Sequence, residues 1–229
     1  MKPLNTLDRA ELYRYLGCGL SGECPPPELE PLVEECIARV LEAARPRAVF
    51  SPALPLNQDG GLRAGTLPLT GQDIALHLEH CSQAVFLAVT LGTQLDALIR
   101  RAEAMDMASA VVMDAAASVA VEQAAQQAEE ELRQTLAEQG LYLTGRYSPG
   151  YGDFSLAVQK DVLRLTDAGR RIGLTVTPSN IMTPRKSITA VLGIAEIPVQ
   201  GHLAGCAHCV LQKTCIFRKR GKRCVVSDQ

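Results

Sequence analysis

The sequence contains no tryptophan, few other aromatic residues and no long apolar run. Aromatic residues make up only 4% of its 229 positions. No stretch reaches the roughly 18 consecutive apolar residues that a membrane-spanning helix needs. The segment Met1 to Leu12 also lacks the apolar core of a signal peptide. These absences exclude a helical membrane protein and predict a cytoplasmic one.

A strong excess of charge of either sign is also absent. The formal net charge is -2, and 47% of the residues are hydrophobic. A chain of this length and composition can bury one large core, with room for a small appendage. The near-neutral total hides one asymmetry, because the segment Lys213 to Arg223 is strongly basic while the helices predicted before it are acidic.

Cysteine is comparatively abundant, with eight residues in the chain. In a protein that is not exported, such residues are more often thiols, metal ligands or cluster ligands than disulfides. The last four follow the pattern C-x2-C-x5-C-x8-C and comprise Cys206, Cys209, Cys215 and Cys224. Four thiolates, or three with the imidazole of His208, suit structural zinc, and four thiolates also suit an iron-sulfur cluster. The spacing leaves both alternatives open.

Hydrophobic periodicity predicts helices and strands in an irregular order. The predicted helices cover 7–16, 28–44, 93–104, 106–138 and 156–165, with a shorter one from a capping Thr70 to His80. The predicted strands cover 48–56, 62–69, 84–89, 174–176, 187–194 and 197–199. Helices packed against a mainly antiparallel or mixed sheet make an α+β fold.

The loop from Arg146 to Asp153 has the composition of a binding loop. Pro149 restricts the backbone, while Gly150 can adopt positive φ and let a ligand approach the main chain closely. Arg146 offers a fork of donors for a carboxylate or phosphate, and Tyr151 offers a ring face for a cation. A proline-glycine turn whose arginine pairs with a nearby helix carboxylate is the alternative interpretation.

Two motifs in this region resemble a known family. The first is RxxPGY, from Arg146 to Tyr151, and the second spans Thr177 to Thr189 and contains Met182, Pro184 and Ser187 in the form Met-x-Pro-x-x-Ser. Together they resemble the activation domain of cobalamin-dependent methionine synthase. The resemblance covers roughly residues 87–194, with weaker similarity before them. In that family the domain follows a cobalamin-binding module, which this sequence lacks in recognisable form.

The resemblance implies a role in reactivating a corrinoid. In the family, a flavodoxin-like or ferredoxin-like donor supplies an electron that regenerates cobalt(I), which then takes a methyl group from S-adenosylmethionine. By this resemblance Arg146 binds the methionyl carboxylate and Glu122 the ammonium, with Asp114 as a second acidic candidate. The Gly150 main chain and Tyr151 then lie beside the rest of the ligand, and the second motif, with Met182 and Ser187, belongs to strands that face the corrin.

The sequence departs from the family pattern at two points. Leu192 stands where family members often carry an aromatic residue, and the acidic residue that the longer domain supplies near its start has no clear counterpart. The resemblance thus predicts an activation-like domain over residues 1–200 and a cysteine-rich metal or iron-sulfur tail over residues 201–229. It implies a corrinoid methionine synthase as partner, with the cobalamin carried by that partner. An iron-sulfur electron-transfer or redox-sensing protein, and a nucleic-acid-binding protein with a zinc tail, are the alternatives.

Overall fold

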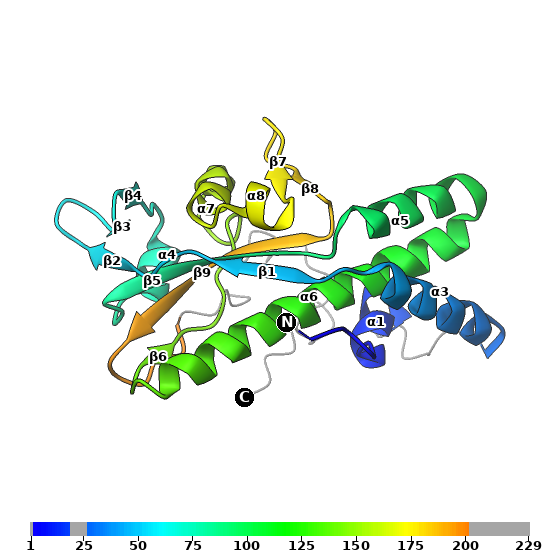
Figure 1. The fold of residues 1–229 in the computed structure, drawn as a ribbon, viewed down its shortest axis with the longest axis horizontal. Coiled ribbons are helices and arrows are strands. Elements are labelled where there is room, and N and C mark those ends of the chain that lie inside the picture. Colours follow the sequence, from blue (N-terminus) through cyan, green and yellow to red (C-terminus); the bar gives the residue numbers. More distant parts are fainter. Residues whose placement is uncertain (1, 19–26, 202–229) are drawn as a thin grey trace.

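A computed structural model describes residues 2–18 and 27–201 of the chain. It shows an α+β fold in which helices cover a mainly antiparallel sheet (Figure 1). The helical elements are α1 (Arg9–Tyr15), η1 (Pro27–Leu29), α3 (Glu30–Ala43), α4 (Gln72–His77), α5 (Thr93–Met105), α6 (Met107–Ala137), η2 (Leu156–Val158), α7 (Gln159–Leu165) and α8 (Ala168–Ile172). The α+β prediction is therefore confirmed.

Two long strands form the centre of the sheet. They are β5 (Gln83–Thr90) and β9 (Ser187–Ala195), and they pair antiparallel from Gln83 opposite Ile194 to Thr90 opposite Ser187. The other edge of β5 pairs with β1 (Arg47–Phe50) and β2 (Leu54–Asn57). The strand β2 also pairs with β3 (Arg63–Ala64), and β3 pairs with β4 (Leu67–Pro68). On its far side β9 pairs with β6 (Tyr142–Leu143), while β7 (Thr175–Val176) and β8 (Met182–Thr183) form a separate hairpin.

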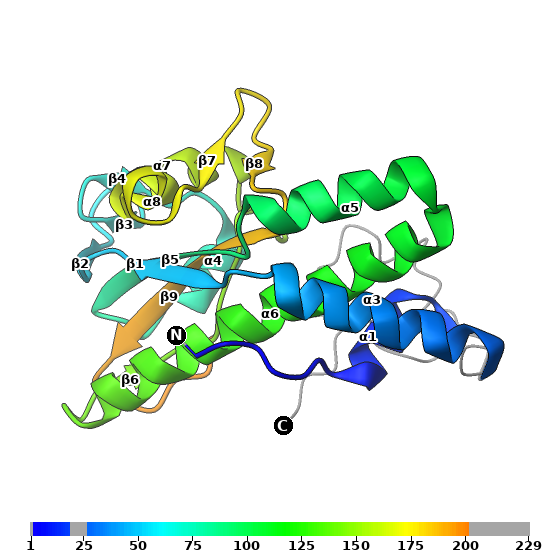
Figure 2. The ribbon, with the colours of Figure 1, turned by 45° about the vertical axis from the view of Figure 1, so that its right-hand side comes forward.

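The two faces of the sheet bury different sets of residues. Along β5, Val85, Leu87 and Val89 join the core that contains α3, α5 and α6, whereas Phe86 points into the opposite core. Side chains alternate between the faces of a strand, so a strand covered on both sides reads as one continuous apolar run. Figure 2 shows α6 on one face, and α7 and α8 on the other.

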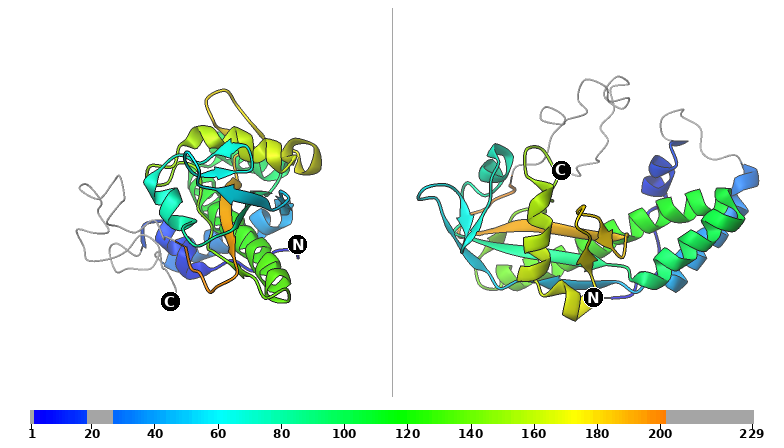
Figure 3. Two further views of the ribbon diagram at one scale, coloured as in Figure 1. Left: turned by 90° about the vertical axis from the view of Figure 1, so that its left-hand side faces the viewer. Right: turned by 90° about the horizontal axis from the view of Figure 1, so that it is seen from above.

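The helix α6 is the longest element, with 31 residues. Asp106 caps its first turn by accepting a hydrogen bond from the Ala108 backbone N–H at 3.1 Å. Its many buried alanines leave little side-chain bulk between the helix and its neighbours, so it can pack closely against α3, α5 and the sheet. Figure 3 shows it running along one face of the sheet, with α3 and α5 extending beyond one end.

Three details of the predicted elements were wrong. The helix predicted to run from Thr70 to His80 is α4, and its N-cap is Gly71 rather than Thr70. The single strand predicted over residues 48–56 is divided into β1 and β2, with residues 51–53 between them. Residues 197–199 form no strand, since the Gln200 carbonyl bonds to the Gly145 N–H outside the sheet ladder. Within the described ranges, no helix combines the length and the apolar character that crossing a bilayer requires.

Candidate functional site

The loop that begins at Arg146 is attached to the central strand β9. Tyr147 and Val191 exchange two backbone hydrogen bonds, of 2.9 and 2.8 Å. The Tyr147 ring is buried in the core on the α4 and α7 side of the sheet. Because consecutive side chains of an extended backbone point to opposite faces, Arg146 is directed to the α6 side.

Arg146 binds two carboxylates of α6. Its Nε lies 2.9 Å from Oε2 of Glu129, and its Nη1 lies 3.1 Å from Oε2 of Glu122. The side chains of Arg146 and Glu129 are 20% and 16% exposed, whereas that of Glu122 is 44% exposed. The structure therefore shows the helix-carboxylate pairing that was the alternative interpretation, and one of the two partners is the predicted Glu122.

A second arginine supports this ion pair. Arg133 lies 2.6 Å from Glu129 and donates to the backbone carbonyls of Leu143 and Thr144, which lead into the loop. Glu129 is thus held by two guanidinium groups, while the more exposed Glu122 is held by Arg146. Nη2 of Arg146 has no partner among the residues that the structure describes.

This arrangement is chemically matched to a zwitterionic amino acid. Glu129 fixes the orientation of the guanidinium through Nε, so the Nη1 and Nη2 edge can receive a ligand carboxylate in bidentate form. A carboxylate bound there would displace Glu122 from Nη1, and the released Glu122 carboxylate would then be able to pair with an ammonium group. The ion pair between Arg146 and Glu122 can therefore be exchanged for one with a ligand, because an equivalent pair of charges would leave no charge unpaired.

The far end of the loop is fastened to α4. The Asp153 carboxylate accepts hydrogen bonds from the backbone N–H groups of Gln72 and Asp73, at 2.6 and 3.1 Å, and so caps α4. The Asp73 carboxylate in turn accepts from the Asp153 N–H at 3.3 Å. Gly152 has a φ of +51°, and a Cβ there would lie 2.9 Å from the carboxylate carbon of Asp73. The space beside the Gly152 backbone is therefore filled by Asp73 and not left for a ligand.

The other loop residues differ in exposure. Pro149 is buried and Gly150 is exposed, with a φ of +93°. The Tyr151 ring is exposed and meets Tyr147 edge-on, with centroids 6.2 Å apart. The structure therefore leaves the Gly150 main chain and the Tyr151 ring accessible on the surface of the loop.

Burial raises the pKa of Tyr147 to about 12, and the charges of Asp73 and Asp153 add to the effect. Because the folded-state pKa lies above the ordinary value of 10.0, this stabilising contribution is complete below pH 10 and is lost as the pH rises toward 12. The difference corresponds to about 3 kcal/mol.

We therefore expect Tyr147→Phe to remove this part of the alkaline loss of stability. Chemical denaturation at intervals from pH 9 to pH 12 measures it. A decline that begins nearer pH 9 is expected to remain in the variant, because burial also raises the pKa of the Cys81 thiol to about 11. Identical stability profiles for the variant and the wild type between pH 10 and 12 would show that folding does not raise the pKa of Tyr147.

The second motif lies apart from the Arg146 pair. Ser187 is buried, and its hydroxyl oxygen lies within hydrogen-bond distance of Thr90 Oγ1 and of the Pro184 carbonyl oxygen, at 2.9 and 2.8 Å. Met182 packs against the core beneath α7 and α8. Ser187 precedes Val191, the partner of Tyr147, by four residues of β9, which is about 13 Å. The structure brings Arg146 and Glu122 together, but it does not add Met182 or Ser187 to them.

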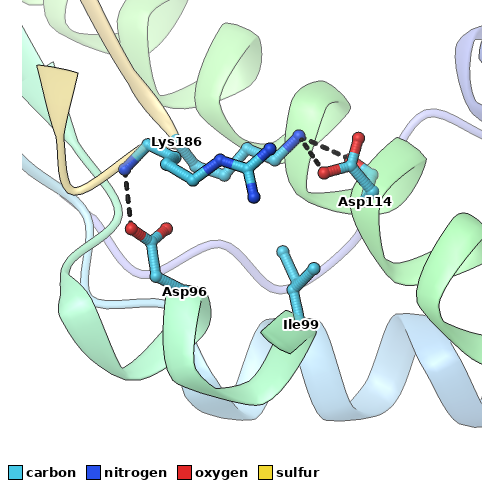
Figure 4. A pocket seen from close by; sticks show the side chains of 5 residues that line it. Asp96, Ile99, Asp114 and Lys186 are labelled. Atoms are coloured by element: carbon cyan, nitrogen blue, oxygen red, sulfur yellow. Dashed lines mark hydrogen bonds and ion pairs between the residues drawn. The ribbon is translucent and has the colours of Figure 1, made fainter. Parts of the chain in front are cut away.

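The second motif also borders a small cavity between α5 and α6. Its lining residues are Asp96, Ile99, Asp114, Arg185 and Lys186 (Figure 4). Asp114, the second acidic candidate, binds the Lys186 ammonium at 2.8 Å and therefore belongs to this group. Leu192, where the family pattern has an aromatic residue, is fully buried in the core with α6.

Comparisons with known proteins identify a structural likeness. No protein-family model matches the chain, and no curated protein matches it. The crystal structure of the MetH reactivation domain bound to AdoHcy matches with a TM-score of 0.57 and 17% identity, over 93% of this chain and 82% of that one. The fold is that of the MetH reactivation domain. At this identity the likeness to the MetH reactivation domain establishes the shared fold alone.

The predicted metal ligands Cys206, Cys209, Cys215 and Cys224 lie outside the described residues, as does His208. Within the residues that are described, no group of three or more His, Cys, Asp or Glu side chains could hold a metal ion. The described chain ends at Gly201, beside the loop, where Gly145 N–H donates to the Gln200 carbonyl at 3.2 Å. A Cβ at Gly201 would lie 2.6 Å from the His77 ring, so this end of the described chain is closely packed.

Sequence reasoning missed three charged residues of the site region, namely Glu129, Arg133 and Lys186. The helix period contained a signal for the acidic one. Asp114, Ser118, Glu122 and Glu129 are separated by four, four and seven residues, so they share one face of α6. The cations Lys186 and Arg146 come from later parts of the chain and bind along that face, whereas Arg133 lies on α6 itself, four residues after Glu129.

Proposed function

We propose that this protein binds S-adenosylmethionine and supports reductive remethylation of the cobalamin of a methionine synthase or related corrinoid methyltransferase. The observation that carries the proposal is the exchangeable pair of Arg146 and Glu122 at 3.1 Å beside the RxxPGY loop. The fold shared with an AdoHcy-bound reactivation domain supports it. The proposed partner is the corrinoid protein that carries the cobalamin.

The proposed site assigns each part of the ligand to one protein group. Arg146 receives the carboxylate, and Glu122 receives the ammonium after it leaves Arg146. The exposed Gly150 main chain allows close approach of the adenosyl part. The exposed ring of Tyr151 lies beside the positively charged sulfonium, where its π face stabilises a cation.

Binding contributes position rather than bond making. The corrinoid of the partner would supply the nucleophile, and this chain's own residues would hold the methyl donor and its demethylated product, S-adenosylhomocysteine. The protein's own task is to hold the sulfonium methyl in a fixed direction and to keep the charged head of the ligand away from the reacting centre. A guanidinium oriented by Glu129 through Nε suits this task, because its geometry is set before the ligand arrives.

We further propose that residues 201–229 form a metal-bound tail. The ligands are Cys206, Cys209, Cys215 and Cys224, which hold an iron-sulfur cluster, with zinc as the alternative. Cys206 follows Gly201 by five residues in the sequence, and Gly201, the last described residue, packs against His77 next to the loop. That short tether favours a role in passing an electron from a flavodoxin or ferredoxin to the bound partner.

An electron-transfer or redox-sensing protein without ligand binding is the second candidate. In this second candidate the metal-bound tail is functional, and the ion pair between Arg146 and Glu122 has a structural role only. The attachment of the chain beside the loop at Gln200 and Gly201 is compatible with both candidate functions. Ligand binding at Arg146 therefore distinguishes them.

One preparation tests both parts of the proposal. We expect anaerobically purified protein to bind S-adenosylhomocysteine in calorimetry with one site per chain, and to contain iron and sulfide that Cys209→Ser removes. 5′-Methylthioadenosine, which lacks the amino acid head, is the matched ligand and should bind more weakly. A chain that contains the cluster but fails to bind S-adenosylhomocysteine would support the second candidate, and stoichiometric zinc without iron would exclude the cluster.

A further inference from the structure

Arg146 and Glu122 belong to separate elements, the loop and α6. Both elements contact the strand β9. Arg146 is placed through its neighbour Tyr147, which exchanges two backbone hydrogen bonds with Val191 of β9. Glu122 lies near the middle of α6. The distance between the two charged groups therefore depends on how α6 is held against β9.

Lys186, the residue immediately before β9, makes that connection. Its ammonium lies 2.8 Å from the Asp114 carboxylate, 3.0 Å from the Asp114 carbonyl and 2.9 Å from the Ser118 hydroxyl. An ammonium has three N–H donors, so all of them are directed to α6. The Lys186 side chain is only 14% exposed, and Figure 4 shows it reaching Asp114 across the small cavity.

The contact lies one helical turn from the proposed ligand site. Ser118 precedes Glu122 by four residues, which is about 6 Å along the axis of α6. A shift of α6 by about 1 Å is enough to weaken a hydrogen bond or ion pair of this length severely. Fixing Asp114 and Ser118 against the start of β9 therefore fixes where Glu122 meets Arg146.

We propose that Lys186 is a positioning residue of the ligand site, acting through α6 to set the separation of Glu122 and Arg146. This inference rests on the proposed function, because the site that Lys186 positions is the one for the amino acid head of S-adenosylmethionine. Lys186 itself binds no part of the ligand. Its effect is therefore confined to ligands that carry the charged head.

The experiment compares two ligands that differ in that head. We expect Lys186→Met to lower the affinity for S-adenosylhomocysteine about tenfold, within the range of coupling between residues of one network. The affinity for 5′-methylthioadenosine should stay the same, because that ligand has neither the carboxylate nor the ammonium. Lys186→Arg, which keeps a cation with several donors, should restore most of the loss. Calorimetry with each ligand measures both affinities.

A matched control is available at the preceding position. Arg185 is 59% exposed, and its guanidinium lies 3.7 Å from Glu103 of α5, so Arg185→Met removes a neighbouring cation without releasing α6. It should leave both affinities unchanged. If Lys186→Met proves too unstable to titrate, Ser118→Ala removes one of the three bonds without removing a charge, and should give a smaller loss with the same ligand selectivity.

The outcomes separate this inference from the function on which it rests. A wild-type chain that does not bind S-adenosylhomocysteine overturns the proposed function and this inference with it. Wild-type binding with an equal loss for both ligands in Lys186→Met shows a general packing role and overturns the positioning role alone. An unchanged affinity for S-adenosylhomocysteine in Lys186→Met, or in Ser118→Ala if that variant replaces it, does the same.

Discussion

Arg146→Ala is expected to abolish measurable binding of S-adenosylhomocysteine while leaving the protein folded. Removing one partner of a hydrogen-bonded charge pair in a binding site costs about 2 to 5 kcal/mol, or roughly 30- to 5,000-fold in affinity. The loss is large because the ligand carboxylate then faces Glu122 and Glu129 with no guanidinium between them. Calorimetry with S-adenosylhomocysteine measures the effect.

The fold should survive this substitution because the carboxylate left behind keeps another partner. Glu129 remains bound to Arg133 at 2.6 Å, and Glu122 is exposed enough for water to solvate it. The backbone bonds between Tyr147 and Val191 do not involve the Arg146 side chain. Thermal unfolding should therefore shift by only a few degrees, as expected for about 1 kcal/mol in a chain of this size.

Arg146→Lys provides the matched variant for this prediction. Lysine keeps the charge but cannot bind Glu129 and a ligand carboxylate through two edges of one plane. We expect it to recover little of the affinity for S-adenosylhomocysteine, while the affinity for 5′-methylthioadenosine changes little in either variant. An Arg146→Ala protein that is folded and binds S-adenosylhomocysteine as the wild type does would falsify the site assignment.

Gly152→Ala is expected to have the largest effect on stability. The backbone there has a φ of +51°, which costs an alanine about 1 to 2 kcal/mol. Its Cβ would also overlap the buried Asp73 carboxylate, whose carbon would lie 2.9 Å away, and the Tyr147 hydroxyl would lie equally close. Adding the cost of overpacking gives a loss of about 2 to 5 kcal/mol in the free energy of unfolding. Urea denaturation at neutral pH measures it.

Gly150→Ala is the control, since Gly150 lies in the same loop and also has positive φ, at +93°. A Cβ there would meet only the end of the Leu156 side chain, at 3.4 Å. The expected loss is limited to the backbone cost of about 1 to 2 kcal/mol. Equal losses for the two variants would mean that the loop moves away from Asp73 at no cost, and would remove the assigned reason for glycine at position 152.

The sequence predicted the main elements because their signals are local. The strand β5 was predicted from an apolar run, β9 from an imperfect alternation of apolar residues, and α6 from its helical period. The cap of α4 was missed because its acceptor, Asp153, lies about 80 residues away in the sequence. Residues 197–199 looked like a strand, but their neighbour Gln200 bonds to Gly145 rather than to the sheet. Such partners are set by packing, which no local window contains.

In the candidate site, too, the sequence predicted individual residues but not the contacts between them. The RxxPGY motif singled out Arg146, and the alanine-rich helix singled out Glu122, but neither pattern revealed that the two groups lie 3.1 Å apart. The contributions of Glu129 and Lys186 became visible only when the loop, β9 and α6 were placed side by side, whereas Arg133 pairs with Glu129 within α6 itself. Ser187, selected with the second motif, is instead bonded to Thr90 in the sheet.

By itself, the sequence determined where the longest helices and the two central strands lie, since periodic burial acts over a few residues. It also determined which side chains can carry charge or bind thiophilic metals. Only the tertiary structure decided which charges meet, because Arg146 reaches carboxylates 24 and 17 residues earlier in the chain. Arg146 can contact these carboxylates only because the loop and α6 are both held against β9. Contacts of this kind depend on how the whole sheet and its helices pack, not on any one segment.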